Sequence, residues 1–309
     1  MVIEQNVCLA DKNWFKVGGK AQFFAQPNNE KEFGDVLLYA AEHALNLQVF
    51  GEGANILISD AGVAGLVIKP AIKDIVFDTE VVTAGAGVVV QDLIDFCLDH
   101  NLVGLEEFSN IPGSVGGSVY INIHYFDYFL SDFLVQGRVI DKLTGQIQTV
   151  DKDWFKFGYN TSALHDKKYF LVSATFKLKK VDALQAAYAK GCRDQIIRHR
   201  QRRYPTERTC GSFFRNFYDN EVPLLHGKKI PHVAYYLDKV GVKGVLSVGK
   251  AQVSHQHANM IVTKEGATAS DVIDLARKMQ ERVRNEFGIV PQAECQFLGF
   301  DRYPLHKIL

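Results

Sequence analysis

Two glycine-rich strings stand among short β-branched stretches in the first half of the sequence. The first is GEGANIL at residues 51–57, and the second is IPGSVGG at residues 111–117. Backbone amides can hold a pyrophosphate only where the chain comes very close to it, which glycine permits because it lacks a β-carbon and tolerates positive φ. Two such strings in one module predict a large cofactor that lies between two lobes.

Neither string is conclusive alone. The third glycine of a Rossmann fingerprint would fall at Ile56, so for the first string a tight turn between strands is the better interpretation. In the second string, Pro112 fixes one dihedral and the following glycines free the next ones, which predicts a rigid entry to an open loop. Because glycine loses much conformational entropy on folding, such a loop in a plain structural role would be wasteful.

The pattern of apolar residues up to about residue 180 predicts a mixed α/β or α+β module. β-Branched content and length favour strands, and apolar spacing of three to four residues favours helices. The expected strands are Gln48–Phe50, Gly65–Ile68, Val81–Ala84, Val135–Asp141 and Tyr169–Leu178, the expected helices are Glu30–His43 and Val90–His100, and the expected hairpin turn is Lys142–Gln146.

A change of composition after Lys180 predicts a domain boundary there. A basic helix is expected over 182–204, and a second helix is expected from Ser270, as N-cap, to a C-cap at Gly288. A terminal strand over 293–300 would present Glu294 on the face opposite Cys295 and Phe297, because successive side chains alternate. The predicted domains are therefore 1–180, in lobes of about 1–70 and 71–180, and 181–309.

The overall composition restricts the class of protein. The chain has 309 residues, of which 47% are hydrophobic, and its 35 basic residues cancel its 35 acidic ones. No global field therefore attracts nucleic acid or an anionic membrane. Five scattered cysteines without a Cys-x-x-Cys pair predict neither a disulfide framework nor a zinc site, and they favour a reducing compartment. With no signal-peptide pattern and no apolar run of spanning length, we expect a cytoplasmic protein without a metal.

The string GSFFRN at residues 211–216 is the strongest indication of chemistry. It places Ser212 after a glycine, with Arg215 and Asn216 just beyond. A serine nucleophile would need a histidine, a carboxylate and a Gly-x-Ser-x-Gly elbow, and that elbow is absent from the sequence. A serine that donates a proton to a carbanion or enolate needs less machinery. By itself, Glu294 would more often be a surface carboxylate.

Residues 193–208 hold six arginines against two acidic residues. A nucleic-acid patch is one interpretation, and a solvated helix face is the usual one. Some of these arginines could also line a site for a diphosphate, since guanidinium groups bind phosphate in a bidentate manner.

An ordered set of motifs resembles the UDP-N-acetylenolpyruvoylglucosamine reductase family over nearly the whole chain. Each motif is modest, but their order is highly specific. They are FKVGG at 15–19, GEGANILI at 51–58, GAG at 85–87, IPGSVGG at 111–117, GSFFRN at 211–216, GVKG at 241–244, QVSHQHA at 252–258 and ECQFLG at 294–299.

This resemblance implies an α+β fold, with an FAD-binding domain of the vanillyl-alcohol-oxidase (PCMH) type in two lobes and a C-terminal α+β substrate-binding domain. It implies an NADPH-dependent flavoprotein oxidoreductase, UDP-N-acetylmuramate dehydrogenase, that acts in the cytoplasm on the route to peptidoglycan. NADPH reduces a non-covalently bound FAD, which passes hydride to the enolpyruvyl group of UDP-N-acetylglucosamine enolpyruvate. The expected partners are this UDP-sugar and NADPH, and the expected oligomeric state is a monomer.

The resemblance also implies roles for individual residues. Ser212 would donate the proton, Glu294 would lie over the substrate carboxylate, and Asn160 occupies the position of a family arginine. Tyr159, Arg215 and Asn216 would bind substrate. The expected cofactor-binding residues are Gly51, Glu52, Gly53, Ala54, Asn55, Ile56, Ile111, Pro112, Gly113, Ser114, Gly116, Gly117 and Asn122.

The sequence departs from the family pattern at several positions. The family's Tyr-Arg-x-Ser reads Tyr159-Asn160-Thr161-Ser162, and its Asn-Ala-Gly-Ala reads NIHY at 122–125. Asparagine supplies no charge, and a lost oxyanion donor costs about 10²- to 10³-fold in rate. Thr263 and Phe217 replace a common asparagine and a proline. For His124, we expect a packing or polar role rather than a covalent flavin link.

These departures leave alternatives open. Another cation, for example from residues 193–208, could take over the role of the missing arginine. Otherwise the chain is a divergent paralogue that binds FAD and a nucleotide sugar with weak or altered activity. An alcohol oxidase of the same flavin-binding superfamily is disfavoured, because an alcohol oxidase has no carbanion for Ser212 to protonate.

Overall fold

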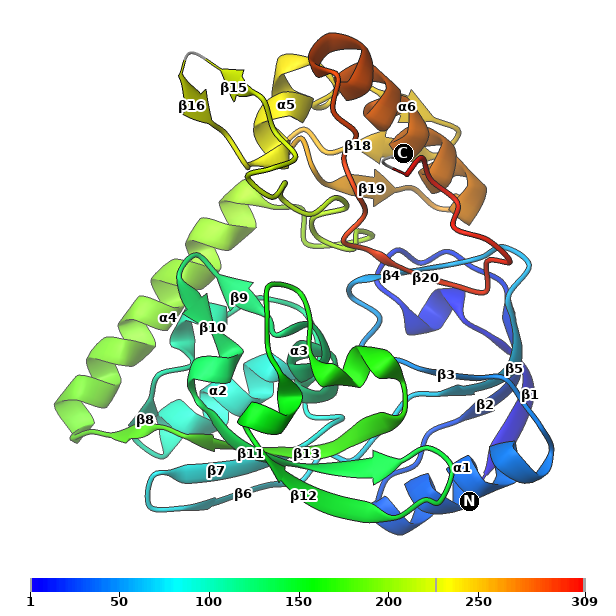
Figure 1. Ribbon diagram of the computed structural model, residues 1–309. Helices are drawn as coiled ribbons and strands as arrows, with labels where there is room; N and C mark the ends of the chain where they lie inside the picture. The colour runs from blue at the N-terminus through cyan, green and yellow to red at the C-terminus, as the bar shows by residue number, and fades with distance from the viewer. Residues whose placement is uncertain (1, 226, 308–309) are drawn as a thin grey trace. The chain divides into compact units, whose positions relative to one another are not determined.

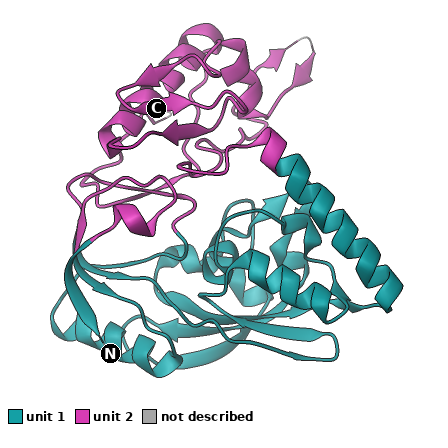
Figure 2. Ribbon diagram, turned by 180° about the vertical axis from the view of Figure 1, so that it is seen from behind, with its two compact units in different colours: residues 1–7, 22–52, 64–200 teal, residues 8–21, 53–63, 201–309 magenta. Residues whose placement is uncertain are grey.

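The computed structural model of the protein describes residues 2–225 and 227–307. Backbone packing divides the chain into two compact units (Figure 2). Residues 1–7, 22–52 and 64–200 form unit 1, and residues 8–21, 53–63 and 201–309 form unit 2. The units do not follow chain order, because two short N-terminal segments pack with the C-terminal residues. The predicted domains with a boundary near residue 180 do follow chain order, and they remain a prediction.

Unit 1 contains two larger sheets (Figure 1). One has the order β1-β2-β5-β3, in which β3 and β5 are parallel, and the other is an antiparallel sheet with the order β12-β11-β13-β7-β6. Their strands are β1 (Ile3–Cys8), β2 (Lys20–Ala25), β3 (Leu47–Val49), β5 (Val63–Ile68), β6 (Ile75–Asp78), β7 (Val81–Gly85), β11 (Leu134–Asp141), β12 (Ile147–Asp151) and β13 (Tyr169–Lys177).

Helices and short strand pairs complete unit 1. The helices are α1 (Glu30–Glu42), α2 (Val90–Asp99), α3 (Val115–Ile121) and α4 (Ala183–Arg203), of which α4 belongs to this unit up to residue 200. The short pairs join β8 (Leu102–Val103) to β14 (Lys179–Lys180) and β9 (His124–Tyr125) to β10 (Tyr128–Phe129). Single 3₁₀ turns occupy Glu106–Phe108, Leu130–Asp132, Asp153–Phe155 and Ala163–Asp166.

The five-stranded sheet is buried on both faces. Val139 belongs to the hydrophobic core that α2 and α3 share, whereas its neighbour Ile140 belongs to the core formed with α1. Since successive residues of a strand point to opposite faces, one strand supplies both cores. The continuous apolar stretches expected from the sequence as strands and helices are confirmed here with small shifts at their ends.

Unit 2 gathers the C-terminal residues and the two N-terminal segments. Its helices are α5 (Val233–Lys239) and α6 (Ala269–Phe287), and Ala10–Lys12 form a 3₁₀ turn. The strands are β4 (Ile56–Ile58), β15 (Leu224–Leu225), β16 (Lys228–Lys229), β17 (Ser247–Val248), β18 (Ala251–Val253), β19 (Ile261–Thr263) and β20 (Gln296–Leu298). One hydrophobic core joins Phe15 and Leu57 to Phe213 and to the buried face of α6.

Three local predictions are corrected. The N-cap of α6 is Thr268 and not Ser270, because the Thr268 side chain accepts from the Asp271 N–H while Asp271 reaches back to the Thr268 N–H. The terminal strand is shorter than expected, and β20 pairs in parallel with β4. The second glycine string is only partly a loop, since its last residues begin α3. Among the described residues, no helix has the length and apolarity to cross a bilayer.

Candidate cofactor and active site

The two glycine strings meet inside unit 1. A β-carbon on Gly51 would lie 2.0 Å from the Oγ of Ser114, so a larger residue would displace the Ser114 side chain. Ser114 is the N-cap of α3, and its Oγ accepts the N–H of Gly117 at 3.3 Å. The predicted cofactor-binding positions 51, 114 and 117 are therefore brought together from chain segments about sixty residues apart.

The backbone of residues 51–55 offers hydrogen-bond donors. None of these five N–H groups donates to another residue in the described part of the chain, and the Oδ1 of Asn55 is buried without a partner there. Within unit 2, a β-carbon on Gly53 would lie 2.7 Å from the Cα of Asn13, so this position also requires glycine. Unpaired consecutive amides with a buried, unsatisfied side chain are what a phosphate-bearing ligand with polar groups needs.

Part of the second string supports the fold, whereas the sequence predicted an open loop there. The N–H groups of Val115 and Gly116 donate to the carbonyl oxygens of Val88 and Ala86 at 2.8 and 2.9 Å. A β-carbon on Gly116 would lie 3.1 Å from the Cβ of Ala86. These amides are therefore occupied, and Gly116 permits close packing of α3.

In the first string, the Glu52 carboxylate forms an ion pair with the Lys69 ammonium group at 3.2 Å.

A tight turn in unit 1 holds Tyr159 and Asn160. Gly158 and Thr161 exchange backbone hydrogen bonds, and Asn160 has φ +54°. Asn122 supports this turn, because its Nδ2 donates to the carbonyl oxygen of Gly158 at 3.2 Å while its Oδ1 accepts the N–H of Ser131. Asparagine tolerates the left-handed region better than most residues. The Nδ2 of Asn160 is buried and has no partner in the described residues.

In unit 2, the serine string forms a short ladder with the segment that carries Glu294. The N–H of Glu294 donates to the carbonyl oxygen of Phe213 at 2.9 Å, and Phe214 pairs with Ala293. The next step of the same segment ties Gln296 to Asn55, whose carbonyl oxygen accepts the Gln296 N–H at 3.0 Å. Ser212, Glu294 and the end of the first glycine string thus belong to one hydrogen-bonded arrangement.

The Ser212 side chain is placed for chemistry. Gly211, before it, has φ +77°, which favours glycine. Phe213 and Phe214, after it, are buried and hold the backbone in the core. Ser212 is half-buried, and its hydroxyl makes no hydrogen bond to another described residue, so it can serve a bound molecule.

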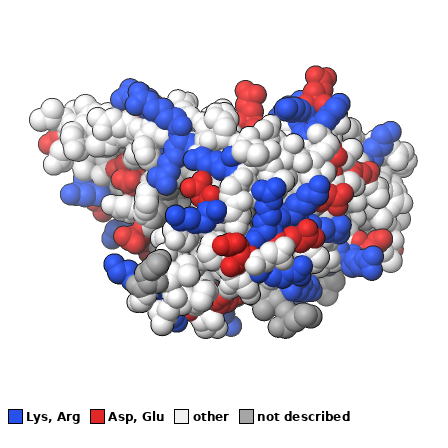
Figure 3. Space-filling view, turned by 90° about the horizontal axis from the view of Figure 1, so that it is seen from above, with Lys and Arg blue, Asp and Glu red and all other residues white. Residues whose placement is uncertain are grey.

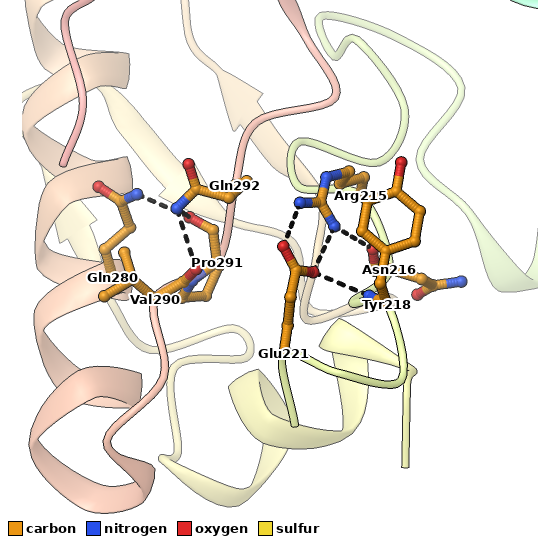
Figure 4. Close-up of polar contacts among 8 residues, drawn as sticks. All are labelled: Arg215, Asn216, Tyr218, Glu221, Gln280, Val290, Pro291 and Gln292. Atoms are coloured by element: carbon orange, nitrogen blue, oxygen red, sulfur yellow. Dashed lines mark hydrogen bonds and ion pairs between the residues drawn. The ribbon is translucent and has the colours of Figure 1, made fainter. Parts of the chain in front are cut away.

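Arg215 is held by its own neighbours (Figure 4). Its guanidinium group makes two hydrogen bonds to the Glu221 carboxylate at 2.6 and 2.7 Å and lies 4.3 Å from the centre of the Tyr218 ring. The hydrogen bond from Arg215 lowers the pKa of Glu221. Asn216 uses its Oδ1 to accept the Val233 N–H at 3.2 Å. Arg215 and Asn216, two of the three expected substrate-binding residues, therefore have internal partners that fix their orientation.

Burial controls the titration of the groups around the serine string. It raises the pKa of the Cys295 thiol well above its ordinary value, with a further contribution from a hydrogen bond with Cys210. Cys295 is thus a neutral filler beside Glu294, and Cys210 is a small buried residue beside the serine string. Burial also lowers the pKa of His257 to about 4, so this ring is neutral at physiological pH.

Two residues near these sites were not among the expected site residues. Asn259 is buried and holds the serine string, because its Nδ2 donates to the Phe214 carbonyl oxygen at 2.7 Å and its Oδ1 accepts the Phe214 N–H at 3.0 Å. It directly follows the matched motif at 252–258, which could have drawn attention to it. His124 has a buried Nδ1 without a partner among the described residues, and its position in NIHY was the available signal.

Some arginines of the basic segment have internal partners. Arg193 pairs with Asp95 and Asp194, and Arg200 lies 5.0 Å from the centre of the Tyr125 ring. The face seen in Figure 3 shows basic and acidic side chains interspersed. Neither observation favours a nucleic-acid patch. No group of acidic, histidine or cysteine side chains among the described residues could hold a metal ion.

Comparison with known proteins gives consistent results along the chain. Residues 21–151 match the family model described as an FAD binding domain, and residues 203–298 match the C-terminal domain of UDP-N-acetylenolpyruvoylglucosamine reductase. The chain is 31% identical over 302 residues to UDP-N-acetylenolpyruvoylglucosamine reductase 2 of Bacillus cereus, covering 97% of this chain and 94% of the relative. It is 33% identical over 297 residues to the Solibacter usitatus reductase, covering 92% and 93%.

A solved structure agrees with these sequence matches. The crystal structure of the Thermus caldophilus UDP-N-acetylenolpyruvylglucosamine reductase superposes with a TM-score of 0.78 at 27% identity. The match covers 96% of this chain and 99% of that one. The relatives thus match nearly the full length of both compact units.

Proposed function

This chain belongs to the UDP-N-acetylenolpyruvoylglucosamine reductase family, and from that premise we propose that it reduces the enolpyruvyl group of UDP-N-acetylglucosamine enolpyruvate to give UDP-N-acetylmuramate. The enzyme is an NADPH-dependent flavoprotein oxidoreductase of peptidoglycan precursor synthesis. The single observation that carries the assignment of the site is the backbone ladder that joins the serine string to Glu294 and to Asn55.

The residues present fit FAD. The unpaired amides of residues 51–55 and the buried Oδ1 of Asn55 would hold polar groups of the cofactor, and Gly51 lets the Ser114 side chain pack directly against the first string. When bound, FAD supplies a carrier that accepts hydride from NADPH and delivers it to the β-carbon of the enolpyruvyl group. The remaining expected cofactor residues, including Pro112, Gly113 and Asn122, are proposed contacts.

Ser212 is the proposed proton donor. Hydride addition to the β-carbon leaves negative charge on the α-carbon and its carboxylate, so the reaction needs an acid at that carbon. The hydroxyl of Ser212 has no hydrogen-bond partner among the described residues that would hold its proton back. Glu294 is assigned to the region of the substrate carboxylate, and the ladder with Phe213 fixes its backbone.

Arg215, Asn216 and Tyr159 are the proposed contacts for the UDP-sugar. A guanidinium group that is already oriented by Glu221 loses little rotamer entropy when it binds a phosphate oxygen. Asn216 is fixed in the same way by the N–H of Val233. The proposed domains are an FAD-binding domain at 1–180 and a substrate domain at 181–309.

The proposal places the enzyme in the cytoplasm as a monomer. NADPH and UDP-sugars are the substrates of the proposed reaction, and both are intracellular metabolites. All five cysteines are free thiols, which suits a reducing compartment.

The function is tested by following the two half-reactions separately under anaerobic conditions. We expect the purified protein to carry FAD, NADPH to bleach it, and the enolpyruvyl nucleotide to restore its absorbance with formation of UDP-N-acetylmuramate. Binding of the nucleotide without reoxidation would support the divergent paralogue instead. Rapid reoxidation by oxygen alone would indicate an oxidase.

A further inference from the structure

Two departures from the family pattern lie beside one turn of unit 1. His124 stands where the family has glycine, and Asn160 stands where it has arginine. The imidazole of His124 contacts the ring of Tyr159, with 4.8 Å between centroids, and that of Phe129 at 5.4 Å. A large side chain has thus replaced a small one at one position, and the reverse has occurred at the other.

Both replacements leave buried polar atoms unsatisfied. The Nδ1 of His124 and the Nδ2 of Asn160 are buried, and neither has a hydrogen-bond partner in the part of the chain that the structure describes. A buried polar group without a hydrogen-bond partner is destabilising. One of the two nitrogens belongs to a residue that contacts the Tyr159 ring and the other to the residue that follows Tyr159, and such unsatisfied groups are what a ligand with an acceptor group needs.

The conformation of the turn suits the asparagine at position 160. Asn160 has φ +54°, which asparagine adopts more readily than most residues because its short polar side chain can bond locally. The backbone around it is fixed, since Gly158 is bonded both to Thr161 and to the Asn122 side chain. Burial lowers the pKa of His124, so its ring is neutral and one tautomer carries a hydrogen on Nδ1.

We propose that His124 and Asn160 together replace the family arginine, with the Nδ1 of His124 and the Nδ2 of Asn160 donating hydrogen bonds to a carboxylate oxygen of the enolpyruvyl group. This inference rests on the proposed function. Two neutral donors stabilise the charge that develops on this group during hydride addition, in the manner of an oxyanion hole. The Arg193–Arg208 segment is then not required for this role.

The first test separates the ring nitrogen from the ring itself. His124→Phe keeps an aromatic ring against Tyr159 but removes Nδ1, and His124→Asn keeps a polar atom at the same distance from the β-carbon. His43→Phe is the matched control, because His43 also stacks on a tyrosine, Tyr39 at 4.0 Å, but is exposed. For each variant we measure flavin reduction by NADPH, reoxidation by the enolpyruvyl nucleotide, and the Kd of that nucleotide from its perturbation of the flavin spectrum.

In His124→Phe we expect reoxidation to slow about 10²-fold, the magnitude of one lost oxyanion donor. The nucleotide Kd should rise, whereas flavin reduction should stay within twofold of the wild type. His124→Asn should recover most of the lost rate, and His43→Phe should leave all three quantities unchanged. A His124→Phe enzyme with wild-type reoxidation and Kd would overturn the inference.

The second test restores the family pair. Asn160→Arg alone should not raise the reoxidation rate, because His124 occupies the space beside the turn, whereas His124→Gly with Asn160→Arg should exceed His124→Gly by at least about tenfold. Equal reoxidation rates in His124→Gly and in His124→Gly with Asn160→Arg would contradict the proposal that His124 and Asn160 take over the role of the family arginine. Failure of the proposed function is distinguishable, since the wild-type protein itself would then show no reoxidation by the nucleotide.

Discussion

The backbone N–H of Glu294 donates to the carbonyl oxygen of Phe213 at 2.9 Å, which fixes Glu294 beside the residue that follows Ser212. More than eighty residues separate the two along the chain. Backbone pairing of this kind fixes the main chain on both sides of the contact. It gives the proposed proton donor and the proposed carboxylate contact a common support within unit 2.

Replacing Ser212 by alanine should slow reoxidation of the reduced flavin by the enolpyruvyl nucleotide about 10²- to 10⁴-fold, the usual contribution of a positioned proton donor. Flavin reduction by NADPH should not change, because that step needs no acid at the substrate carbon. Anaerobic stopped-flow absorbance measures both rates. Ser270→Ala, which removes a hydroxyl bonded to Asp60 elsewhere in unit 2, is the control and should leave both rates unchanged. An equal loss in both half-reactions would count against the assigned role.

Replacing Gly51 by alanine should strongly reduce the FAD content of the purified protein. The new β-carbon would lie 2.0 Å from the Oγ of Ser114, so the Ser114 hydroxyl must leave its capping position at the start of α3 or the two glycine strings must move apart. Occupancy is read from the ratio of flavin to protein absorbance. Gly191→Ala is the matched control, because no atom lies within 4 Å of its added β-carbon.

A second substitution checks the cause of the lost flavin. Ser114→Gly in the Gly51→Ala background removes the clash, although it also removes the N-cap of α3, worth about 1 kcal/mol. We expect the double variant to retain more FAD than Gly51→Ala alone. A double variant with no more flavin than the single one would show that the contact is not the reason.

Replacing Asn259 by leucine should lower the free energy of unfolding by about 3 kcal/mol, because the N–H and carbonyl groups of buried Phe214 lose their partners. Asn259→Asp keeps the acceptor but not the donor and should cost less. Urea unfolding measures both variants. Asn28→Leu, on the exposed surface, should stay within about 0.5 kcal/mol of the wild type. A similar loss in Asn28→Leu would remove the special role of Asn259.

His257 should make unfolding depend on pH between about 6.5 and 4. Burial lowers its pKa from 6.5 to about 4 in the folded protein, so the unfolded chain binds more protons in this range. The contribution of the neutral, buried His257 to the free energy of unfolding is fully present above pH 6.5. It is lost as the pH falls toward 4, and the loss totals about 3 kcal/mol. His124 and His165, whose pKa values burial also lowers, add to the same trend.

His257→Asn isolates this contribution, since the amide oxygen of asparagine can still accept the Asn259 N–H that now bonds to Nδ1. Between pH 6.5 and 4, this variant should lose less stability than the wild type. Urea unfolding at several pH values provides the measurement. Identical pH profiles for the two proteins would mean that His257 is not the titrating group.

Local spacing in the sequence predicted much of the fold. The apolar stripe of α1 and the β-branched run of β13 are properties of neighbouring residues, which interact through the geometry of a single helix or strand. Gly288 as the C-cap of α6 follows from the same logic, since it adopts φ +72°. The glycine strings and the serine string were also recognisable, because close approach and a positioned hydroxyl each require a particular residue type.

The tertiary structure decided what these local features do together. The parallel pairing of β4 with β20 joins residues about 240 positions apart, and no spacing rule connects them. Thr268 rather than Ser270 caps α6, because Asp60 accepts from the Ser270 hydroxyl and N–H. The buried nitrogens of His124 and Asn160 likewise emerged only once the turn and β9 were packed. The sequence by itself determined which segments would be helices, strands and glycine loops. The three-dimensional path of the chain determined which of them share hydrogen bonds, because such bonds depend on distance in space.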